Sequence, residues 1–290
     1  MKKGLSHKEL DSIIDLALAE DVSHGDVTSE MLIPSELQGR AYMLAKAEGV
    51  LAGIEVVEKV FFKIDPLLEF EGRIKDGAKV KSGDAVATIS GRVASILKGE
   101  RVALNFLSRL SGIATATARF VAEVAGFGVK ISDTRKTTPG LRRLEKYAVS
   151  IGGGHNHRFH LGDGILIKDN HLTALRALGM SLKEIVLKAK QNASQDQVVE
   201  VEVGTAEEAL EAAEAGADII MLDNVSLDEM RRIKGLIPAH IKIEASGGIT
   251  LDSVRAAAQA GVDIISVGAL THSAKALDFS LEFEPETIDN

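Results

Sequence analysis

The stretch AGADII (215–220) returns as AGVDII (260–265), and this repeat decides the fold. In both copies an alanine-rich segment with a helical pattern ends at a glycine, and a short β-branched strand follows at once. Gly216 and Gly261 suit the left-handed position that closes a helix. Strands that alternate with helices of this length predict parallel βαβ units, whose crossovers are nearly always right-handed.

Working outward from the repeat, Thr205 with Glu208 and Ser226 with Glu229 have the spacing of a capping box at a helix start. Short apolar runs predict six strands, at 129–134, 164–169, 198–203, 218–223, 241–245 and 263–267. Six strands are fewer than the eight of a complete (β/α)₈ barrel. We therefore expect either an incomplete barrel or one further strand that the pattern does not reveal.

Residues before about position 110 follow a different pattern. The stretch FEGRIKDGAKVKSGDAVATISGRVASI (70–96) alternates short apolar runs with glycine-containing turns, which predicts antiparallel hairpins. It resembles a lipoyl-like carrier fold in its Gly and Val spacing, but no lysine occupies a recognisable attachment turn. Helices are predicted at 8–20, around 56–62 and from residue 100 onward. We predict a separate α/β domain over 1–112, a barrel over 113–270, and a tail over 271–290 that packs back on the first domain.

The composition excludes several classes of protein. The chain has 45% hydrophobic and 26% charged residues, as ordinary soluble proteins do, and it has no cysteine. Disulfides, thiolate metal sites, iron–sulfur clusters and a cysteine nucleophile are therefore excluded. The two lysines near the N-terminus precede no apolar run, so no signal peptide is expected, and no stretch approaches the length of a membrane span. We expect a cytoplasmic protein with no membrane partner.

Charge is distributed unevenly along the chain. The formal net charge of −8 and the 4% aromatic content disfavour nucleic-acid binding, which needs clustered cations or stacking rings. Between positions 130 and 171, however, eight Lys and Arg residues stand against four Asp and Glu residues. Such a basic segment in an acidic chain can concentrate an anionic ligand. A solvated helix face is the alternative, and we favour it for Arg142, Arg143 and Lys146.

Polar residues follow every predicted strand. In a parallel barrel the carboxyl ends of the strands converge on one mouth, where polar residues tend to be functional. No Ser–His–Asp arrangement and no histidine pair at helical metal-ligand spacing is found there. The six ends are Thr134-Arg135-Lys136, Lys168-Asp169-Asn170, Glu202, Asp223-Asn224, Ser246-Gly247-Gly248 and Val267-Gly268-Ala269.

The glycine turns after the last two strands favour a phosphate. Backbone N–H groups at a loop before a helix bind phosphate, and barrels commonly build this site from their last two strand-to-helix loops. A glycine after one strand is more often ordinary turn chemistry. Together, Gly247, Gly248 and Gly268 predict a bound phosphate group.

Two carboxylates end neighbouring predicted strands. Glu202 and Asp223 would both point toward the mouth, and such oxygen ligands suit Mg²⁺ that arrives with substrate phosphates. Hydrogen bonding to sugar hydroxyls is an alternative of nearly equal weight. Glu200 has the same strand parity as Glu202 but lies deeper, so we rank it lower.

The stretch GGGHNHRFHLGDGILIKDNH (152–171) contains four of the eight histidines. Its glycines are not a dinucleotide fingerprint, because no strand precedes them and the G-x-G-x-x-G spacing is absent. We interpret the segment as a flexible loop that brings His157 and Arg158 over the mouth. The roles of the other histidines in the stretch stay open, and those outside it are expected to be incidental. The first group is His155, His160 and His171, and the second is His7, His24, His240 and His272.

The chain resembles the quinolinate phosphoribosyltransferase family, also called nicotinate-nucleotide pyrophosphorylase (carboxylating). The resemblance covers nearly the whole chain, and TRKTTPG, GGGxNHR and LIKDNH are its most specific parts. The similar segments are LAEDVSHGDVTSE, ERVALNFLSRLSGIAT, DTRKTTPGLRRLEKYAV, GGGHNHRFHLGDGILIKDNH, VEVEV, IMLDN and EASGGI.

The resemblance implies an activity and a fold. Such enzymes join quinolinate to 5-phosphoribosyl-1-pyrophosphate with Mg²⁺, and they release pyrophosphate and CO₂ to give nicotinate mononucleotide on the pathway to NAD. The implied fold is an N-terminal α/β sandwich domain followed by an incomplete α/β barrel. It also implies a homodimer whose pocket is completed by an arginine of the partner chain, which by position is Arg101.

The resemblance also implies roles for individual residues. The anion pocket would be lined by Arg101, Thr134, Arg135, Lys136, His157, Arg158 and Lys168. Glu202 and Asp223 would hold the ribose hydroxyls or Mg²⁺, and with Lys136 and Lys168 they would be the catalytic residues. The 5-phosphate would be bound by Ser246, Gly247, Gly248, Val267, Gly268 and Ala269.

Three other functions compete with this one. A related phosphoribosyltransferase acting on nicotinate or another heterocycle would need fewer cations around the ring. A barrel aldolase would use a Schiff-base lysine at a strand end, either Lys168 or Lys242. A non-catalytic phosphate-binding module is disfavoured, because cations and carboxylates end different strands that face one mouth.

Overall fold

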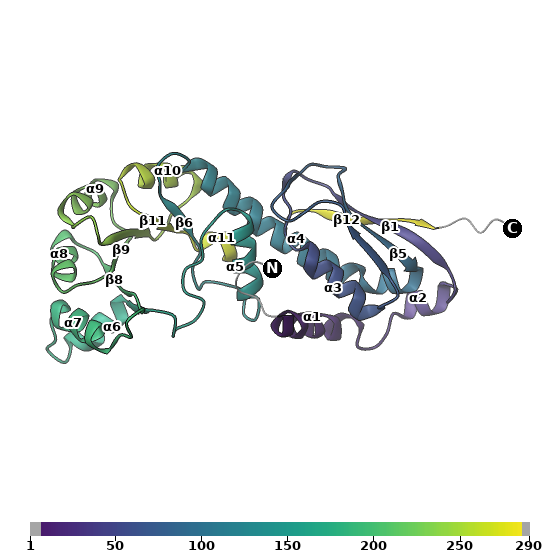
Figure 1. Cartoon of the computed structure of the whole chain (residues 1–290), viewed down its shortest axis with the longest axis horizontal. Coiled ribbons are helices and arrows are strands. Elements are labelled where there is room, and N and C mark those ends of the chain that lie inside the picture. Colours follow the sequence, from purple (N-terminus) through teal and green to yellow (C-terminus); the bar gives the residue numbers. More distant parts are fainter. Residues whose placement is uncertain (1–6, 286–290) are drawn as a thin grey trace. The chain divides into compact units, whose positions relative to one another are not determined.

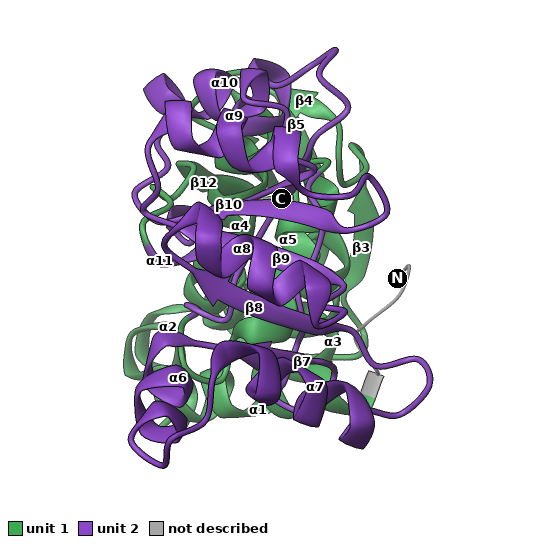
Figure 2. Cartoon of the chain, turned by 90° about the vertical axis from the view of Figure 1, so that its left-hand side faces the viewer, with its two compact units in different colours: residues 1–118, 138–153, 273–290 green, residues 119–137, 154–272 purple. Residues whose placement is uncertain are grey.

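The computed structural model describes residues 7–285, which form two compact units (Figures 1 and 2). Unit 1 comprises Met1–Ala118, Thr138–Gly153 and Ser273–Asn290, and unit 2 comprises Arg119–Thr137 and Gly154–His272. The chain therefore crosses between the units more often than the linear division at 112 and 270 anticipates. A local sequence pattern cannot reveal such a crossing, because it depends on contacts between distant segments.

Unit 1 is built on a four-stranded antiparallel sheet with the order β12-β1-β5-β3. Every second residue of β1 is buried over most of its length, which gives the sheet one core-facing side. A small pair, β2 and β4, lies outside this sheet. The strands are β1 Gln38–Ala45, β2 Gly49–Val50, β3 Glu69–Gly72, β4 Lys79–Val80, β5 Ala85–Arg92 and β12 Phe279–Pro285.

The helices of unit 1 match the predicted patterns at 8–20 and 56–62, which are α1 (His7–Val22) and α3 (Ile54–Ile64). A short helix, α2 (Val27–Leu32), lies between them in sequence. The predicted helix from residue 100 is α4 (Val93–Glu123), which begins earlier, so the end of the predicted hairpin stretch is helical. The tail strand β12 pairs with β1 inside this unit.

Helix α5 (Arg142–Ile151) also belongs to unit 1, and it corrects the prediction of a solvated face. Lys146 is fully buried, while Arg142 and Arg143 are half-buried. The Nε atom of Arg143 lies 2.9 Å from a carboxylate oxygen of Glu9 on α1. The basic residues of this helix are therefore part of the packing of unit 1.

Unit 2 contains all six predicted strands in one parallel sheet with the order β6-β11-β10-β9-β8-β7. Helices α8, α9 and α10 cover the outer side of the curved sheet (Figure 1). The strands are β6 Lys130–Ser132, β7 Ile165–Ile167, β8 Val199–Val203, β9 Ile219–Asp223, β10 Lys242–Ser246 and β11 Ile264–Ser266. The helices are α6 Asp169–Arg176, α7 Leu182–Asn192, α8 Ala206–Glu214, α9 Leu227–Leu236, α10 Leu251–Gln259 and α11 Ala269–His272.

The expectation of an incomplete barrel is confirmed, because β6 and β7 remain the two edges of the sheet. A single parallel bridge between Ser132 and His155 extends the β6 edge. There the amide of His155 donates to the carbonyl of Ile131 at 2.8 Å. The loop after Gly152–Gly154 therefore pairs with the β6 edge at one residue only. The sequence pattern allowed for one further strand, and this bridge lies where such a strand would begin to pair.

The predicted helix ends are confirmed, but neither of the two predicted capping boxes is complete. Thr205 and Ser226 accept from the amides three residues ahead, and Gly216 and Gly261 have φ values of 88° and 87°. The carboxylate of Glu208 returns to the amide of Gly204 at 3.0 Å rather than to that of Thr205. Among residues 7–285, no helix has the length and apolar character needed to cross a membrane.

Candidate active site

A cavity of about 350 Å³ opens at the carboxyl ends of the strands in unit 2. Its lining brings together many of the residues predicted from the sequence, which are Thr134, Arg135, Lys136, His157, Arg158, Lys168, Glu202, Asp223 and Ser246. The sequence interpretation missed its other lining residues, which are Leu166, Met221, Glu244 and Ser266. Its volume lies at the lower end of the range for small-molecule sites.

The remaining predicted residues lie outside this lining. The residues of the two glycine turns follow the paired strands β10 and β11. They are Gly247, Gly248, Val267, Gly268 and Ala269. Arg101 belongs to unit 1, where it is exposed on α4. Lys242 begins β10 and lies 3.0 Å from Asp263, so this alternative Schiff-base lysine is at the opposite end of its strand from the cavity.

Two buried arginine groups define the charge of the cavity. The Nε atoms of Arg135 and Arg158 are buried, and neither has a hydrogen-bond partner in the described part of the chain. Burial lowers the pKa of Arg158, and the positive charge of Arg135 lowers it further. Arg158 also donates from Nη1 to the carbonyl of Gly164 at 2.9 Å. Unpaired buried N–H groups are costly, so an anionic ligand that accepts from both arginines would be stabilised here.

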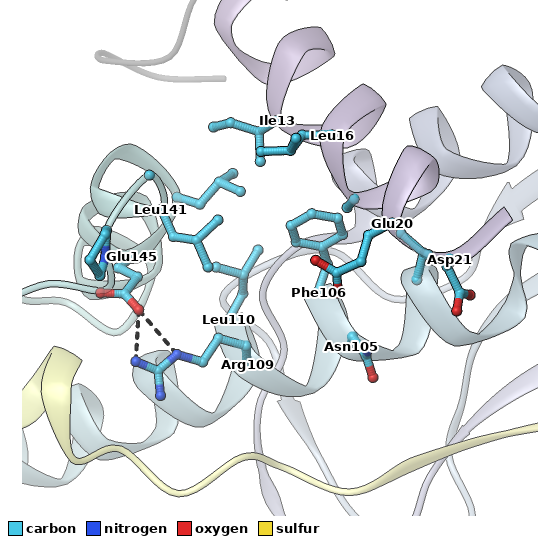
Figure 3. Close-up of a pocket in the computed structure, with 15 residues that line it drawn as sticks. Ile13, Leu16, Glu20, Asp21, Asn105, Phe106, Arg109, Leu110, Leu141 and Glu145 are labelled. Carbon is cyan, nitrogen blue, oxygen red and sulfur yellow. Dashed lines mark hydrogen bonds and ion pairs between the residues drawn. The ribbon is translucent and has the colours of Figure 1, made fainter. Parts of the chain in front are cut away.

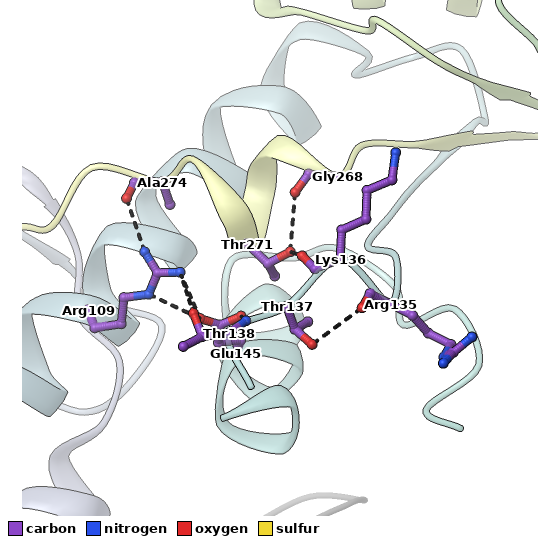
Figure 4. Close-up of polar contacts among 9 residues, drawn as sticks. All are labelled: Arg109, Arg135, Lys136, Thr137, Thr138, Glu145, Gly268, Thr271 and Ala274. Atoms are coloured by element: carbon purple, nitrogen blue, oxygen red, sulfur yellow. Dashed lines mark hydrogen bonds and ion pairs between the residues drawn. The ribbon is translucent and has the colours of Figure 1, made fainter. Parts of the chain in front are cut away.

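The backbone of Lys136 is fixed within unit 2 (Figure 4). Its amide donates to Oγ1 of Thr134 at 3.0 Å, and Thr271 Oγ1 lies 2.7 Å from its carbonyl oxygen. The same hydroxyl lies 3.2 Å from the carbonyl of Gly268. In Figure 4 the aliphatic chain of Lys136 extends away from these contacts, which leaves its ammonium group available to a ligand.

In unit 1, Glu145 is a fully buried carboxylate that the sequence interpretation missed. It accepts from Nε and Nη2 of Arg109 at 3.1 and 2.7 Å (Figure 3). It also accepts from the amide and hydroxyl of Thr138 at 3.1 and 2.7 Å (Figure 4). Thr138 follows Lys136 by two positions in the sequence. The network therefore fixes the chain just after Lys136, which is one of the candidate catalytic residues.

The carboxylates Glu202 and Asp223 both line the cavity. Burial raises the pKa of Glu202, and the negative charge of Asp223 raises it further. The ammonium of Lys168 lies 3.9 Å from Glu202. Lys168 is itself held at the start of α6, where its amide donates to Nδ1 of His171 at 2.9 Å. His171 therefore accepts a structural hydrogen bond beside the site. The sequence pattern had left the role of this histidine open.

A second acidic pair, Glu200 and Glu244, surrounds His157, and Glu244 and His157 themselves line the cavity. Nε2 of His157 is 3.1 Å from Glu200 and 3.9 Å from Glu244, and both carboxylates are buried. Its Nδ1 accepts from the amide of Arg158 at 2.8 Å, so the proton of the ring resides on Nε2. The three side chains also lie within the spacing of a metal site.

The raised pKa of Glu244 predicts that the free energy of unfolding depends on pH. Burial, with a further contribution from the charge of Glu200, raises its pKa from an ordinary 4.5 to about 7. The folded state therefore favours the protonated acid, and this stability is lost as the pH rises from 4.5 through about 7. We expect wild-type protein to lose roughly 1–3 kcal/mol of unfolding free energy from this group between pH 5 and pH 8.

Urea unfolding of Glu244→Gln at the two pH values measures this effect. Glutamine cannot ionise, so the loss of unfolding free energy between pH 5 and pH 8 should be smaller than in the wild type. Glu214→Gln, on the exposed end of α8, is the matched control and should keep the wild-type dependence. An unchanged pH dependence in Glu244→Gln would contradict the prediction.

The turn after β10 requires glycine for a geometric reason. Gly247 has φ +87°, and a Cβ atom there would collide with the side chain and the amide of Asn224. Asn224 is itself left-handed, with φ 55°, and its amide donates to the carbonyl of Ser246 at 3.0 Å. Its side-chain amide donates to Asp223 at 2.9 Å. The glycine turn and the carboxylate at the end of β9 therefore support each other.

None of the other histidines whose side chains are described lines this cavity. Their side chains are exposed, and these histidines are His24, His155, His160, His240 and His272. His160 lies 2.8 Å from Asp163 within its own loop. The side chain of His7 and the N-terminal segment 1–6 lie outside the described residues.

Comparisons with known proteins agree with this geometry. Residues 26–111 match the family model "Quinolinate phosphoribosyl transferase, N-terminal domain", and residues 113–282 match that of the C-terminal domain. A probable nicotinate-nucleotide pyrophosphorylase [carboxylating] of Bacillus subtilis is 46% identical over 96% of this chain and 94% of its own length. The chloroplastic nicotinate-nucleotide pyrophosphorylase [carboxylating] of Arabidopsis thaliana is 43% identical over 96% of this chain and 84% of its own.

Solved structures give the same result. NadC from Streptococcus pyogenes superposes with a TM-score of 0.92 at 43% identity, covering 98% of this chain and 99% of that one. The nicotinate-nucleotide pyrophosphorylase from Francisella tularensis has a TM-score of 0.91 at 36% identity, covering 97% and 98%.

Proposed function

The chain belongs to the quinolinate phosphoribosyltransferase family, and we propose on this premise that it converts quinolinate and 5-phosphoribosyl-1-pyrophosphate into nicotinate mononucleotide, pyrophosphate and CO₂. The observation that carries the proposal is the pair of buried, unpartnered Nε atoms of Arg135 and Arg158 beside one cavity. Their N–H groups need an acceptor, and a pyridine with two carboxylates supplies several.

Quinolinate binding follows from the charges in the cavity. Hydrogen bonds to charged groups contribute about 1.5–3 kcal/mol each. The planar guanidinium groups of Arg135 and Arg158 suit carboxylates, and Lys136 and Lys168 add further positive charge. Burial of the two arginine Nε atoms strengthens their contacts, because little water screens them.

The sugar phosphate would occupy the other side of the cavity. Glu202 and Asp223 would hold the ribose hydroxyls or Mg²⁺, while Ser246 and the glycine turns after β10 and β11 would receive the 5-phosphate. The mutual repulsion of Glu202 and Asp223, seen in the raised pKa of Glu202, makes a cation between them favourable. Mg²⁺, when bound, neutralises the charge that develops on the departing pyrophosphate.

The reaction then needs no covalent nucleophile. The bond from the ribose C1 to pyrophosphate breaks with its electron pair, and the ring nitrogen of quinolinate forms the new bond to C1. Lysine ammonium groups at 136 and 168 stabilise the departing negative charge. The ring nitrogen is now positive, so it stabilises the carbanion that remains when the adjacent carboxylate leaves as CO₂. A proton then adds to that carbon.

We further propose that the enzyme works in the cytoplasm as a homodimer, in which Arg101 completes the pocket of the partner chain. Arg101 is exposed on α4. A residue that acts in the pocket of another chain has to be accessible on the surface of its own protomer. The family resemblance supports the assignment of this residue.

The decisive experiment is incubation with quinolinate, 5-phosphoribosyl-1-pyrophosphate and Mg²⁺, with CO₂ and nucleotide measured together. Equal amounts of both products are expected. Nicotinate replaces quinolinate as one control, and EDTA removes the metal in another. Nucleotide formed from nicotinate instead of quinolinate would favour the related phosphoribosyltransferase. Trapping of a carbonyl substrate by borohydride would favour the Schiff-base aldolase.

Arg158→Lys tests the role of the guanidinium. Lysine keeps the charge but loses the planar pair of donors, so we expect the KM for quinolinate to rise roughly 10- to 100-fold. The KM for the sugar phosphate should change little. Steady-state kinetics measures both constants. Arg231→Lys, on the exposed face of α9, is the control and should behave as the wild type. An unaltered KM for quinolinate in Arg158→Lys would remove this arginine from the substrate pocket.

A further inference from the structure

We propose that Asp133 is a positioning residue that clamps the two cationic segments of the quinolinate pocket together, an inference that rests on the proposed function. Asp133 directly follows β6 and does not line the cavity, so it acts through other residues. Its side chain is fully buried.

Three contacts of Asp133 reach one short segment and form the clamp. Oδ1 of Asp133 accepts from the amide of His157 at 2.9 Å, and Oδ2 accepts from Nδ2 of Asn156 at 2.6 Å. The amide of Asp133 donates to the carbonyl of His155 at 3.1 Å. One residue therefore holds three consecutive residues of the loop.

The segments joined in this way carry the two arginines of the pocket. Arg135 follows Asp133 by two positions, and Arg158 directly follows His157. Their guanidinium groups repel each other, as the effect of Arg135 on the pKa of Arg158 shows after that of burial. Without a bound anion, this repulsion favours separation of the two segments.

Hydrogen bonds to a charged, buried carboxylate are among the strongest in proteins, and they oppose this repulsion. The pocket is then held ready for a dianion before the substrate arrives. Preorganisation of this kind improves affinity, because less ordering is left to occur on binding. The expected signature of Asp133 is therefore weaker quinolinate binding, without an equal effect on the sugar phosphate.

Asp133→Asn tests the clamp, because asparagine keeps the shape of the side chain but turns one oxygen into an NH₂ donor that faces the NH₂ of Asn156. We expect the KM for quinolinate, and its Kd by isothermal titration calorimetry, to rise about 10-fold or more. The KM for the sugar phosphate should stay within about 3-fold of wild type. Asp228→Asn, at an exposed position on α9, is the matched control and should change none of these constants.

A reciprocal variant separates positioning from simple structural support. In Asp133→Asn/Asn156→Asp the donor and acceptor exchange places, so the side-chain bond can form again. We expect the Kd for quinolinate to recover most of its loss relative to Asp133→Asn alone. If Asp133→Asn does not fold, Asn156→Ala removes the contact to Oδ2 of Asp133, keeps the carboxylate, and should weaken quinolinate binding in the same direction.

The outcomes are distinguishable. Lower thermal stability with an unchanged KM and Kd for quinolinate would overturn the inference and leave Asp133 a structural residue. Failure of the double variant to recover binding would also overturn it. Absence of nucleotide formation by the wild-type protein, in contrast, would overturn the proposed function itself.

Discussion

Dimers assembled from Arg101→Ala chains and Lys168→Ala chains are expected to recover an activity that neither variant has alone. Each homodimer lacks one cation in each of its pockets, and the loss of a charged contact there, at about 1.5–3 kcal/mol, should lower its kcat/KM for quinolinate roughly 10- to 100-fold. In a mixed dimer, the Arg101→Ala chain keeps its own Lys168 and receives Arg101 from its partner. One of the two pockets is then intact.

Random mixing of equal amounts should restore about a quarter of the wild-type activity, because half of the dimers are mixed and each has one intact pocket. The two chains carry different affinity tags, so that mixed dimers can be isolated and their activity measured directly. The control for the exchange procedure is a mixture of Arg101→Ala chains that carry one tag with Arg101→Ala chains that carry the other. Isolated mixed dimers without activity would show that Arg101 does not act in the partner's pocket.

Replacement of Glu145 by alanine is expected to have the largest effect on stability. The carboxylate is fully buried and accepts from Arg109 and Thr138, so its removal breaks the ion pair with Arg109 and both hydrogen bonds from Thr138. Breaking a buried ion pair costs about 3–5 kcal/mol, and the 28% exposure of the Arg109 side chain places the expected loss near roughly 3 kcal/mol. Urea unfolding at neutral pH measures the loss of unfolding free energy.

Two companion variants test the reason for the loss. Glu145→Gln keeps the volume and one acceptor, so it should lose less than Glu145→Ala. In Arg109→Met/Glu145→Leu both charges are replaced by apolar groups, so neither partner of the ion pair remains without the other, and part of the stability should be recovered. Equal losses in Glu145→Ala and the double variant would show that packing, rather than charge, explains the effect.

The sequence predicted the strands of unit 2 well, because each buried strand is a compact apolar run between a helix end and a polar residue. For Asp218 to Asp223 the glycine at the helix end, the β-branched residues and the final carboxylate all indicate the same element. The residues at the strand ends were predicted for the same reason, since topology alone brings the carboxyl ends of parallel strands together.

Features that depend on distant partners could not be predicted in this way. Glu145 is separated from Arg109 by 36 positions, and only their pairing allows the carboxylate to be buried. Lys146 and Glu244 are likewise ionisable residues in the core, although their local patterns resemble those of surface residues. The early start of α4 at Val93 was missed because the sequence around Gly91 resembles a turn, although the chain continues there from β5 directly into the helix.

The pairing of β1 with β12 has a consequence for how the protein is made. Gly39 is aligned with Pro285 and Ala45 with Phe279, so a strand from the first part of the chain pairs with the last strand of the described residues. During translation, β1 leaves the ribosome long before β12 is synthesised. Until then β1 presents an unpaired edge, which is a site of aggregation in nascent polypeptides. Chaperone dependence during synthesis should therefore fall when β12 is moved ahead of β1 by circular permutation.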